Sequence, residues 1–149
     1  MIQRWWSELL AWIRARNQPR ERPTHLHRGA LGERTAADHL RAAGFQILVR
    51  NYRCEFGELD LVAKDQDCLV FIEVKTRSQG QWLRPAAAVN RRKRQRLCRT
   101  ALRYLRESGN PRTRIRFDIV EVILRNNTVQ SVHHLPNAFP MQDAVIYPV

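Results

Sequence analysis

An acidic residue on each of two neighbouring apolar runs, together with a nearby lysine, is the arrangement in this sequence that could do chemistry. The segment GELDLVAKDQDCLVFIEVKT spans residues 57–76 and predicts two strands joined by a turn at residues 66–67. Such a turn places Asp60 directly opposite Glu73. Because side chains alternate along a strand, Asp60, Glu73 and Lys75 would share one face of the hairpin. The core-facing side would carry Leu59, Leu61, Ile72 and Val74.

Two carboxylates and an ammonium group on a hydrophobic hairpin are costly unless something compensates their charge. Mg²⁺ or Mn²⁺ can do so, because these cations prefer oxygen ligands and leave room for water and substrate phosphate. Asp60 and Glu73 are therefore candidate metal ligands, and Lys75 is a candidate for positioning the water that attacks a phosphodiester. The alternative is a solvated strand face with an incidental charge cluster. Phe71 and Val62 share that face and argue against full solvation.

The net charge of +12 is concentrated in residues 84–116, which contain twelve basic side chains and one acidic side chain. Arginines recur there at spacings of four, three, four and three residues, so they form one stripe along a predicted helix. The alternative is a solvated helix face, but such faces usually mix charges of both signs. The stripe and an adjacent lysine predict contact with the phosphate backbone of nucleic acid, through Arg92, Lys93, Arg96, Arg99, Arg103 and Arg106.

Hydrophobic periodicity predicts the elements that must position these residues, in the order helix, three strands, helix, two strands. The helices are expected at residues 30–43 and from Pro85 to about Ser108, each followed by a glycine stop. The strands are expected at residues 45–53, 58–63, 68–76, 114–124 and 128–135.

The chain is expected to hold one folded domain at residues 29–136, between an N-terminal extension and a C-terminal tail at residues 137–149. Residues 1–16 predict an amphipathic helix that packs on its own domain, on a partner protein or on a membrane surface. Residues 17–28 predict a flexible basic linker. No signal peptide is recognisable, and three cysteines without a paired motif suit a reducing compartment, so a cytoplasmic location is expected.

The segments Gly57–Ala63 and Phe71–Arg77 resemble the YraN-type family of bacterial proteins, which is grouped with the PD-(D/E)xK nucleases. The layout is similar to that of the archaeal Holliday-junction resolvases. The resemblance covers about residues 29–124 and extends through Gly32-Glu33, Arg50–Arg53, Lys93 and Arg116–Val120. The proline of the superfamily motif is absent here, since Leu59 precedes Asp60.

This resemblance implies a restriction-endonuclease-like α/β core, with a mixed sheet of about five strands flanked by helices. It also implies that Asp60 and Glu73 bind the metal, that Lys75 is the catalytic lysine and that Glu33 completes the site. From the residues alone, Glu33 could equally be a first-turn glutamate favoured by the helix dipole. For Asp118, a structural hydrogen bond or ion pair is the expected role.

The expected function is metal-dependent hydrolysis of phosphodiesters, by an endonuclease that acts on branched or otherwise structured DNA. A homodimer is expected by analogy with the junction resolvases. One alternative is a nucleic-acid-binding protein that retains the nuclease fold without catalysis. Another is a partner-binding protein whose N-terminal helix and arginines meet an acidic protein or a membrane surface.

Overall fold

The computed structural model describes residues 2–16, 27–81 and 89–141 of the chain. Helices and strands follow one another in the predicted order, preceded by the N-terminal helix, so the α/β fold is confirmed. The elements are α1 (Ile2–Arg16), α2 (His27–Ala42), β1 (Gln46–Cys54), β2 (Gly57–Asp65), β3 (Cys68–Ser78), α3 (Arg91–Glu107), β4 (Arg114–Arg125) and β5 (Thr128–Phe139).

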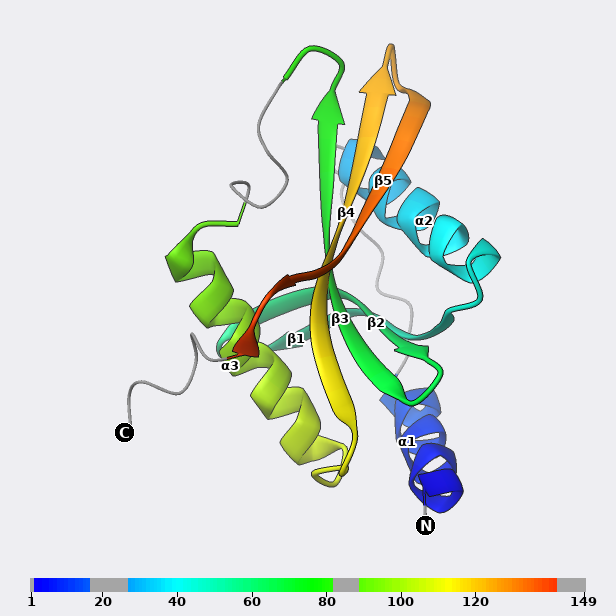
Figure 1. Cartoon of the computed structure of the whole chain (residues 1–149), viewed down its shortest axis with the longest axis vertical. Coiled ribbons are helices and arrows are strands. Elements are labelled where there is room, and N and C mark those ends of the chain that lie inside the picture. The colour runs from blue at the N-terminus through cyan, green and yellow to red at the C-terminus, as the bar shows by residue number, and fades with distance from the viewer. Residues whose placement is uncertain (1, 17–26, 82–88, 142–149) are drawn as a thin grey trace.

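The five strands form one mixed sheet in the order β1-β2-β3-β4-β5. Only β3 and β4 pair in parallel, and the chain crosses between them through α3, which Figure 1 shows away from α2 across the sheet. The other neighbouring strands are antiparallel. The strand β3 lies in the middle of the sheet, and its candidate residues Glu73 and Lys75 pair with β4, just beyond the last pair that β3 makes with β2.

Helices cover both faces of the sheet, so the core is divided into two clusters. Leu69 and Phe71 of β3 pack in the cluster that contains side chains of α1 and α3. Their neighbours Val70 and Ile72 point the other way, into the cluster built around α2. Burial on both faces explains why β3 reads as an unbroken apolar run rather than as an alternating strand.

The close approach of α2 to β3 depends on Gly32. A Cβ atom at this position would overlap Oγ1 of Thr76, so only glycine allows the helix to lie so near the strand. Glu33 follows directly in the chain and is half-buried. The packing of α2 therefore brings Glu33 to the part of β3 that carries the candidate site.

The apolar face of α1 is buried in the core of the same chain. Trp6, Leu9 and Ile13 lie in the cluster beneath α1 and α3, and Nε1 of Trp5 donates to the carbonyl oxygen of Ser108 at 3.0 Å. Of the three predicted binding surfaces for this apolar face, which were its own domain, a partner protein and a membrane, the structure shows the first. Within the described residues, no helix has the length and apolar character needed to cross a membrane.

Several predicted boundaries are wrong, and each has a local cause. The second predicted helix begins at Arg91 rather than at Pro85, because Oδ1 of Asn90 caps it by accepting from the backbone N–H of Lys93 at 2.9 Å. Residues 82–88 lie outside the described residues, as do residues 17–26 of the predicted linker. The last two linker positions, 27 and 28, belong to α2.

The third strand is longer than predicted, because β3 continues through Arg77 and Ser78 against β4. Likewise, β5 does not end at Leu135. An irregularity in its pairing with β4, near Asn137, lets the strand continue to Phe139, whose side chain is buried. The predicted tail therefore begins inside a strand, and residues 142–149 lie outside the described residues.

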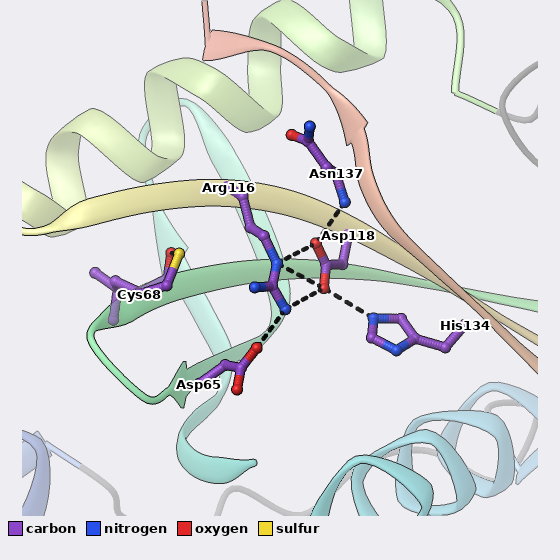
Figure 2. Close-up of polar contacts among 7 residues, drawn as sticks. Asp65, Cys68, Arg116, Asp118, His134 and Asn137 are labelled. Carbon is purple, nitrogen blue, oxygen red and sulfur yellow. Dashed lines mark hydrogen bonds and ion pairs between the residues drawn. The ribbon is translucent and has the colours of Figure 1, made fainter. Parts of the chain in front are cut away.

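Asp118 lies at the centre of a buried network between β4 and β5 (Figure 2). Its carboxylate is fully buried and accepts from Nε of Arg116 at 2.9 Å, from Nε2 of His134 at 2.8 Å and from the backbone N–H of Asn137 at 2.9 Å. Arg116 also pairs with Asp65, at 2.9 Å. The network joins three strands, which agrees with the structural role expected for Asp118.

Burial alone would raise the pKa of Asp118, but the hydrogen bonds from His134, Arg116 and Asn137 outweigh it and lower the pKa below its ordinary 3.8. Between these two pKa values the unfolded chain binds a proton that the folded chain does not. The ionised Asp118 carboxylate therefore stabilises the folded state above pH 3.8, and this contribution is lost as the pH falls through the pKa of Asp118 in the folded chain.

We expect Asp118→Asn to lower the free energy of unfolding by about 3 kcal/mol at pH 7, since it leaves buried donors facing an amide. Urea denaturation at a series of pH values measures this, and the gap to the wild type should shrink below pH ~4. Asp38→Asn is the matched control, because Asp38 is exposed and pairs only on the surface of α2. Equal losses in both variants would contradict the assigned role.

Asn51 has a positive φ of 54° in the middle of β1. It lies between the pairs Arg50–Leu61 and Tyr52–Leu59, which places it across from Asp60. Its Oδ1 atom is buried and has no hydrogen-bond partner. A left-handed residue inside a strand interrupts the alternation of side chains, and glycine would adopt this conformation without the cost that alanine incurs.

Asn51→Ala should therefore lower the free energy of unfolding by about 1 kcal/mol, whereas Asn51→Gly should have a smaller effect. Thermal and urea unfolding of the two variants side by side would measure the difference. If Asn51→Gly were the more damaging change, the side chain rather than the backbone conformation would be what matters for stability.

Candidate active site

The hairpin of β2 and β3 opens where the candidate carboxylates lie. The strands pair from Asp65–Cys68 as far as Leu61–Ile72, which is the predicted register. At the next position, the backbone N–H of Val74 donates to Oδ2 of Asp60 at 2.8 Å. The Asp60 carboxylate thus occupies the place of a strand carbonyl, and this hydrogen bond holds it next to Glu73.

The predicted division of apolar side chains in this hairpin is partly wrong. Leu61, Ile72 and Val74 pack in the cluster around α2, as one face of the hairpin should. Leu59, however, packs in the opposite cluster, with α1 and α3. The physical reason is that the Asp60 side chain turns toward β3 and that Asn51, across from it, has a positive φ, so regular alternation fails here.

Glu73 is the buried centre of the site, with only 4% of its surface exposed. Its Oε1 atom forms ion pairs with the ammonium groups of Lys75 at 2.7 Å and Lys93 at 3.2 Å. Its Oε2 atom is also buried but has no hydrogen-bond partner. A buried carboxylate oxygen without a donor is costly, so this atom is suited to a ligand that the protein itself does not provide.

Asp60 has a strongly perturbed pKa. Burial raises this pKa, the Glu73 carboxylate raises it further, and Glu33 adds a smaller increase. The hydrogen bond from Val74 and the charge of Lys93 act in the opposite direction, and the resulting pKa is about 7. Two neighbouring carboxylates in a sheltered place resist double ionisation, which is the electrostatic condition that a divalent cation relieves.

Glu33 approaches this pair from α2, on the other side of the sheet. It is the seventh residue of α2, which has no acidic residue in its first turn, so the alternative of a first-turn glutamate is wrong. Its charge acts on Asp60. Among the described residues, however, no three His, Cys, Asp or Glu side chains are grouped closely enough to hold a metal ion.

The donor set therefore fits a cation held by two protein carboxylates, Asp60 and Glu73. This suits Mg²⁺ or Mn²⁺, which commonly take one or two carboxylates and fill their remaining positions with water and phosphate oxygens. It does not suit Zn²⁺, which usually takes three or four protein ligands with His or Cys among them.

An ion pair extends the polar surface along β3 and β4. Arg77 lies two residues beyond Lys75, and its Nε atom is 2.6 Å from Oε1 of Glu121. Glu121 is 8% exposed and stands beside Lys75 in the parallel register. The sequence does not predict this pair, because the predicted third strand ends at residue 76; a glutamate inside the apolar run of residues 117–124 is the available signal.

The predicted arginine stripe lies along α3, but its side chains differ in exposure. The side chains of Arg92, Arg96, Arg99 and Arg106 are exposed, while Leu97, Ala101 and Tyr104 on the opposite face are buried. Arg103 and Lys93, the lysine adjacent to the stripe, instead form ion pairs with acidic side chains.

Arg103 is half-buried and pairs with Glu107 at 2.8 Å and with Glu55 at 3.6 Å. Lys93 turns inward to Glu73. Arg99 remains on the surface and lies over the ring of Phe56, with its Cζ atom 4.5 Å from the ring centre. Lys93 thus belongs to the carboxylate site as much as to the stripe, which residue spacing along the helix did not reveal.

Comparison with known proteins confirms the family resemblance noted from the sequence. The model of the uncharacterised protein family UPF0102 matches residues 32–122. A UPF0102 protein of Trichlorobacter lovleyi is 41% identical over 114 residues, which is 76% of this chain and 90% of that protein. A UPF0102 protein of Nocardia farcinica is 46% identical over 111 residues, 74% of this chain and 87% of that protein.

A UPF0102 protein of Clostridium botulinum is 42% identical over 113 residues, which is 74% of this chain and 92% of that protein. The region matched by the family model includes Glu33, Asp60, Glu73, Lys75 and the whole of α3, and it leaves α1 outside. The chain belongs to the uncharacterised protein family UPF0102.

Proposed function

We propose that this protein is a metal-dependent nuclease that hydrolyses phosphodiester bonds in nucleic acid. The observation that carries the proposal is the buried Glu73 carboxylate, which has one oxygen without a donor and lies beside an Asp60 whose pKa is about 7. A divalent cation would supply the partner that this oxygen lacks and would offset the charge of both carboxylates.

Mg²⁺ or Mn²⁺ bound between Asp60 and Glu73 would supply a Lewis acid and a water of lowered pKa. The residues of this chain would then orient the reaction. Lys75, whose ammonium lies 2.7 Å from Oε1 of Glu73 and whose side chain is 27% exposed, would hold the attacking water. Glu33, on α2, would accept a hydrogen bond from a second water.

The exposed arginines of α3 support nucleic acid as the substrate. Arg92 and Arg96 flank Lys93 on the helix surface, and neither forms an ion pair with an acidic side chain in the described ranges. They are suited to phosphate oxygens. We infer DNA, and in particular branched or otherwise structured DNA cut by a homodimer, from the layout shared with the Holliday-junction resolvases.

A second candidate is a nucleic-acid-binding protein that no longer cleaves. The observation in its favour is that Lys75 and Lys93 both satisfy Oε1 of Glu73, so the carboxylate is partly neutralised by the protein itself. Binding by the arginine stripe would then be independent of Asp60.

Asp60→Asn and Lys75→Met should each reduce Mn²⁺- or Mg²⁺-dependent cleavage about 100-fold or more while leaving DNA binding intact. Labelled duplex, single-stranded, flapped and four-way-junction DNAs would be compared, with Asp38→Asn as a control on the surface of α2. Tight binding without cleavage by the wild type, unchanged in Asp60→Asn, would favour the binding protein. Cleavage that survives both changes would refute this active site.

The double variant Arg92→Gln/Arg96→Gln should weaken binding to all DNAs alike and lower the salt slope, −dlogK/dlog[salt], by about two. Fluorescence anisotropy over a range of salt concentrations measures this slope. Arg41→Gln removes a charge from α2, where Arg41 pairs with Asp38, and is the matched control. An unchanged slope in the double variant would mean that the stripe does not contact phosphates.

A further inference from the structure

We propose that Lys93 is a counter-ion that a divalent cation displaces from Glu73, and that the released ammonium then binds a phosphate of the substrate. This inference rests on the proposed function and assigns Lys93 a role at the same site. Lys93 would thereby link two events, the binding of the cation and the binding of nucleic acid.

The first observation is that two ammonium groups share one carboxylate oxygen. Nζ of Lys75 is 2.7 Å and Nζ of Lys93 is 3.2 Å from Oε1 of Glu73, while Oε2 has no partner. A divalent cation on this carboxylate would face two positive charges within a few ångströms. The repulsion would favour the departure of one ammonium group.

The surroundings of the two lysines indicate which one moves. Lys75 lies on β3, two residues from Glu73, and its backbone is held in the ladder with β4. Lys93 reaches in from the first turn of α3 over a longer path, and its side chain is the more exposed, at 36% against 27%. Its contact with Glu73 is also the longer of the two. Lys93 is therefore the group that leaves more readily.

The movement requires only the side chain. The backbone N–H of Lys93 is fixed by Oδ1 of Asn90, so the start of α3 stays in place. A small recess borders the Lys93 side chain, and its wall includes Gly57, Thr100 and Arg96. Gly57 leaves room there that a larger residue would fill, since a Cβ atom would approach Arg96 and Thr100 to 3.4 Å.

The destination follows from the position of Lys93 on the helix. Lys93 contacts the buried Glu73 and borders the same recess as the exposed Arg96, so a phosphate that enters from the arginine surface would reach Lys93 before it reaches Glu73. An ammonium freed from Glu73 would add a positive charge at this entrance. The cation should thus strengthen DNA binding, and by linkage DNA should strengthen cation binding by the same factor.

The test is Mn²⁺ binding to the full chain by calorimetry, without nucleic acid, followed by cleavage at saturating Mn²⁺. Lys93→Met removes the competing charge, so it should bind Mn²⁺ about fivefold more tightly or better, yet cleave DNA at least about tenfold more slowly. Lys93→Arg keeps the charge and should show little gain in Mn²⁺ affinity. Arg92→Met, one residue away and exposed, should leave Mn²⁺ affinity unchanged.

Unchanged or weaker Mn²⁺ binding by Lys93→Met would overturn the inference, provided that its melting temperature equals that of the wild type. A lower melting temperature would instead be resolved with Lys93→Gln, for which the same opposed changes are expected. If the wild type binds Mn²⁺ and Asp60→Asn does not, while Lys93→Met matches the wild type, only the role of Lys93 fails. If the wild type binds no Mn²⁺, the proposed function fails as well.

Discussion

The hydrogen bond from the Val74 backbone to the Asp60 carboxylate is the constraint on which the candidate site depends. In a continuous hairpin, a backbone carbonyl of β2 would accept a hydrogen bond from β3. Here a side-chain carboxylate accepts it, so the strands separate just beyond Leu61–Ile72 while Asp60 stays attached to β3. The separation makes room for Glu73 and for groups from two helices, and the hydrogen bond keeps both acids together.

The two-sided core makes this arrangement rigid. Because β3 is buried under α2 on one face and under α1 and α3 on the other, its backbone cannot shift to relieve the repulsion between the carboxylates. Gly32 brings α2 close on one face, and the Asn90 cap fixes the start of α3 on the other. Lys93 contacts Glu73 from α3, and the charge of Glu33 on α2 acts on Asp60, whose pKa is raised first by burial and then by the Glu73 charge.

Asp118 is held by the same kind of hydrogen bond as Asp60 but has a structural role. Its carboxylate also accepts a backbone N–H from a neighbouring strand, that of Asn137, at a break in the ladder. Arg116 and His134 satisfy the remaining lone pairs, so the group is held ionised and does not need an external ligand. Asp60 and Glu73 differ because Oε2 of Glu73 is left without a donor. The missing hydrogen-bond donor at this oxygen, rather than the presence of acidic residues, distinguishes the candidate site from the structural network.

The sequence by itself determined the order of elements, the register of the β2–β3 hairpin and the candidate acids, because alternation and turn chemistry act over a few residues. It did not determine the break in alternation at Asp60 or the extension of β5 to Phe139, since both arise from pairing with a neighbouring strand. Nor did it place Lys93 at Glu73 or pair Arg77 with Glu121. Those contacts join residues far apart in the chain, and their distances are set by the packing of α3 on the sheet and by the pairing of β3 with β4.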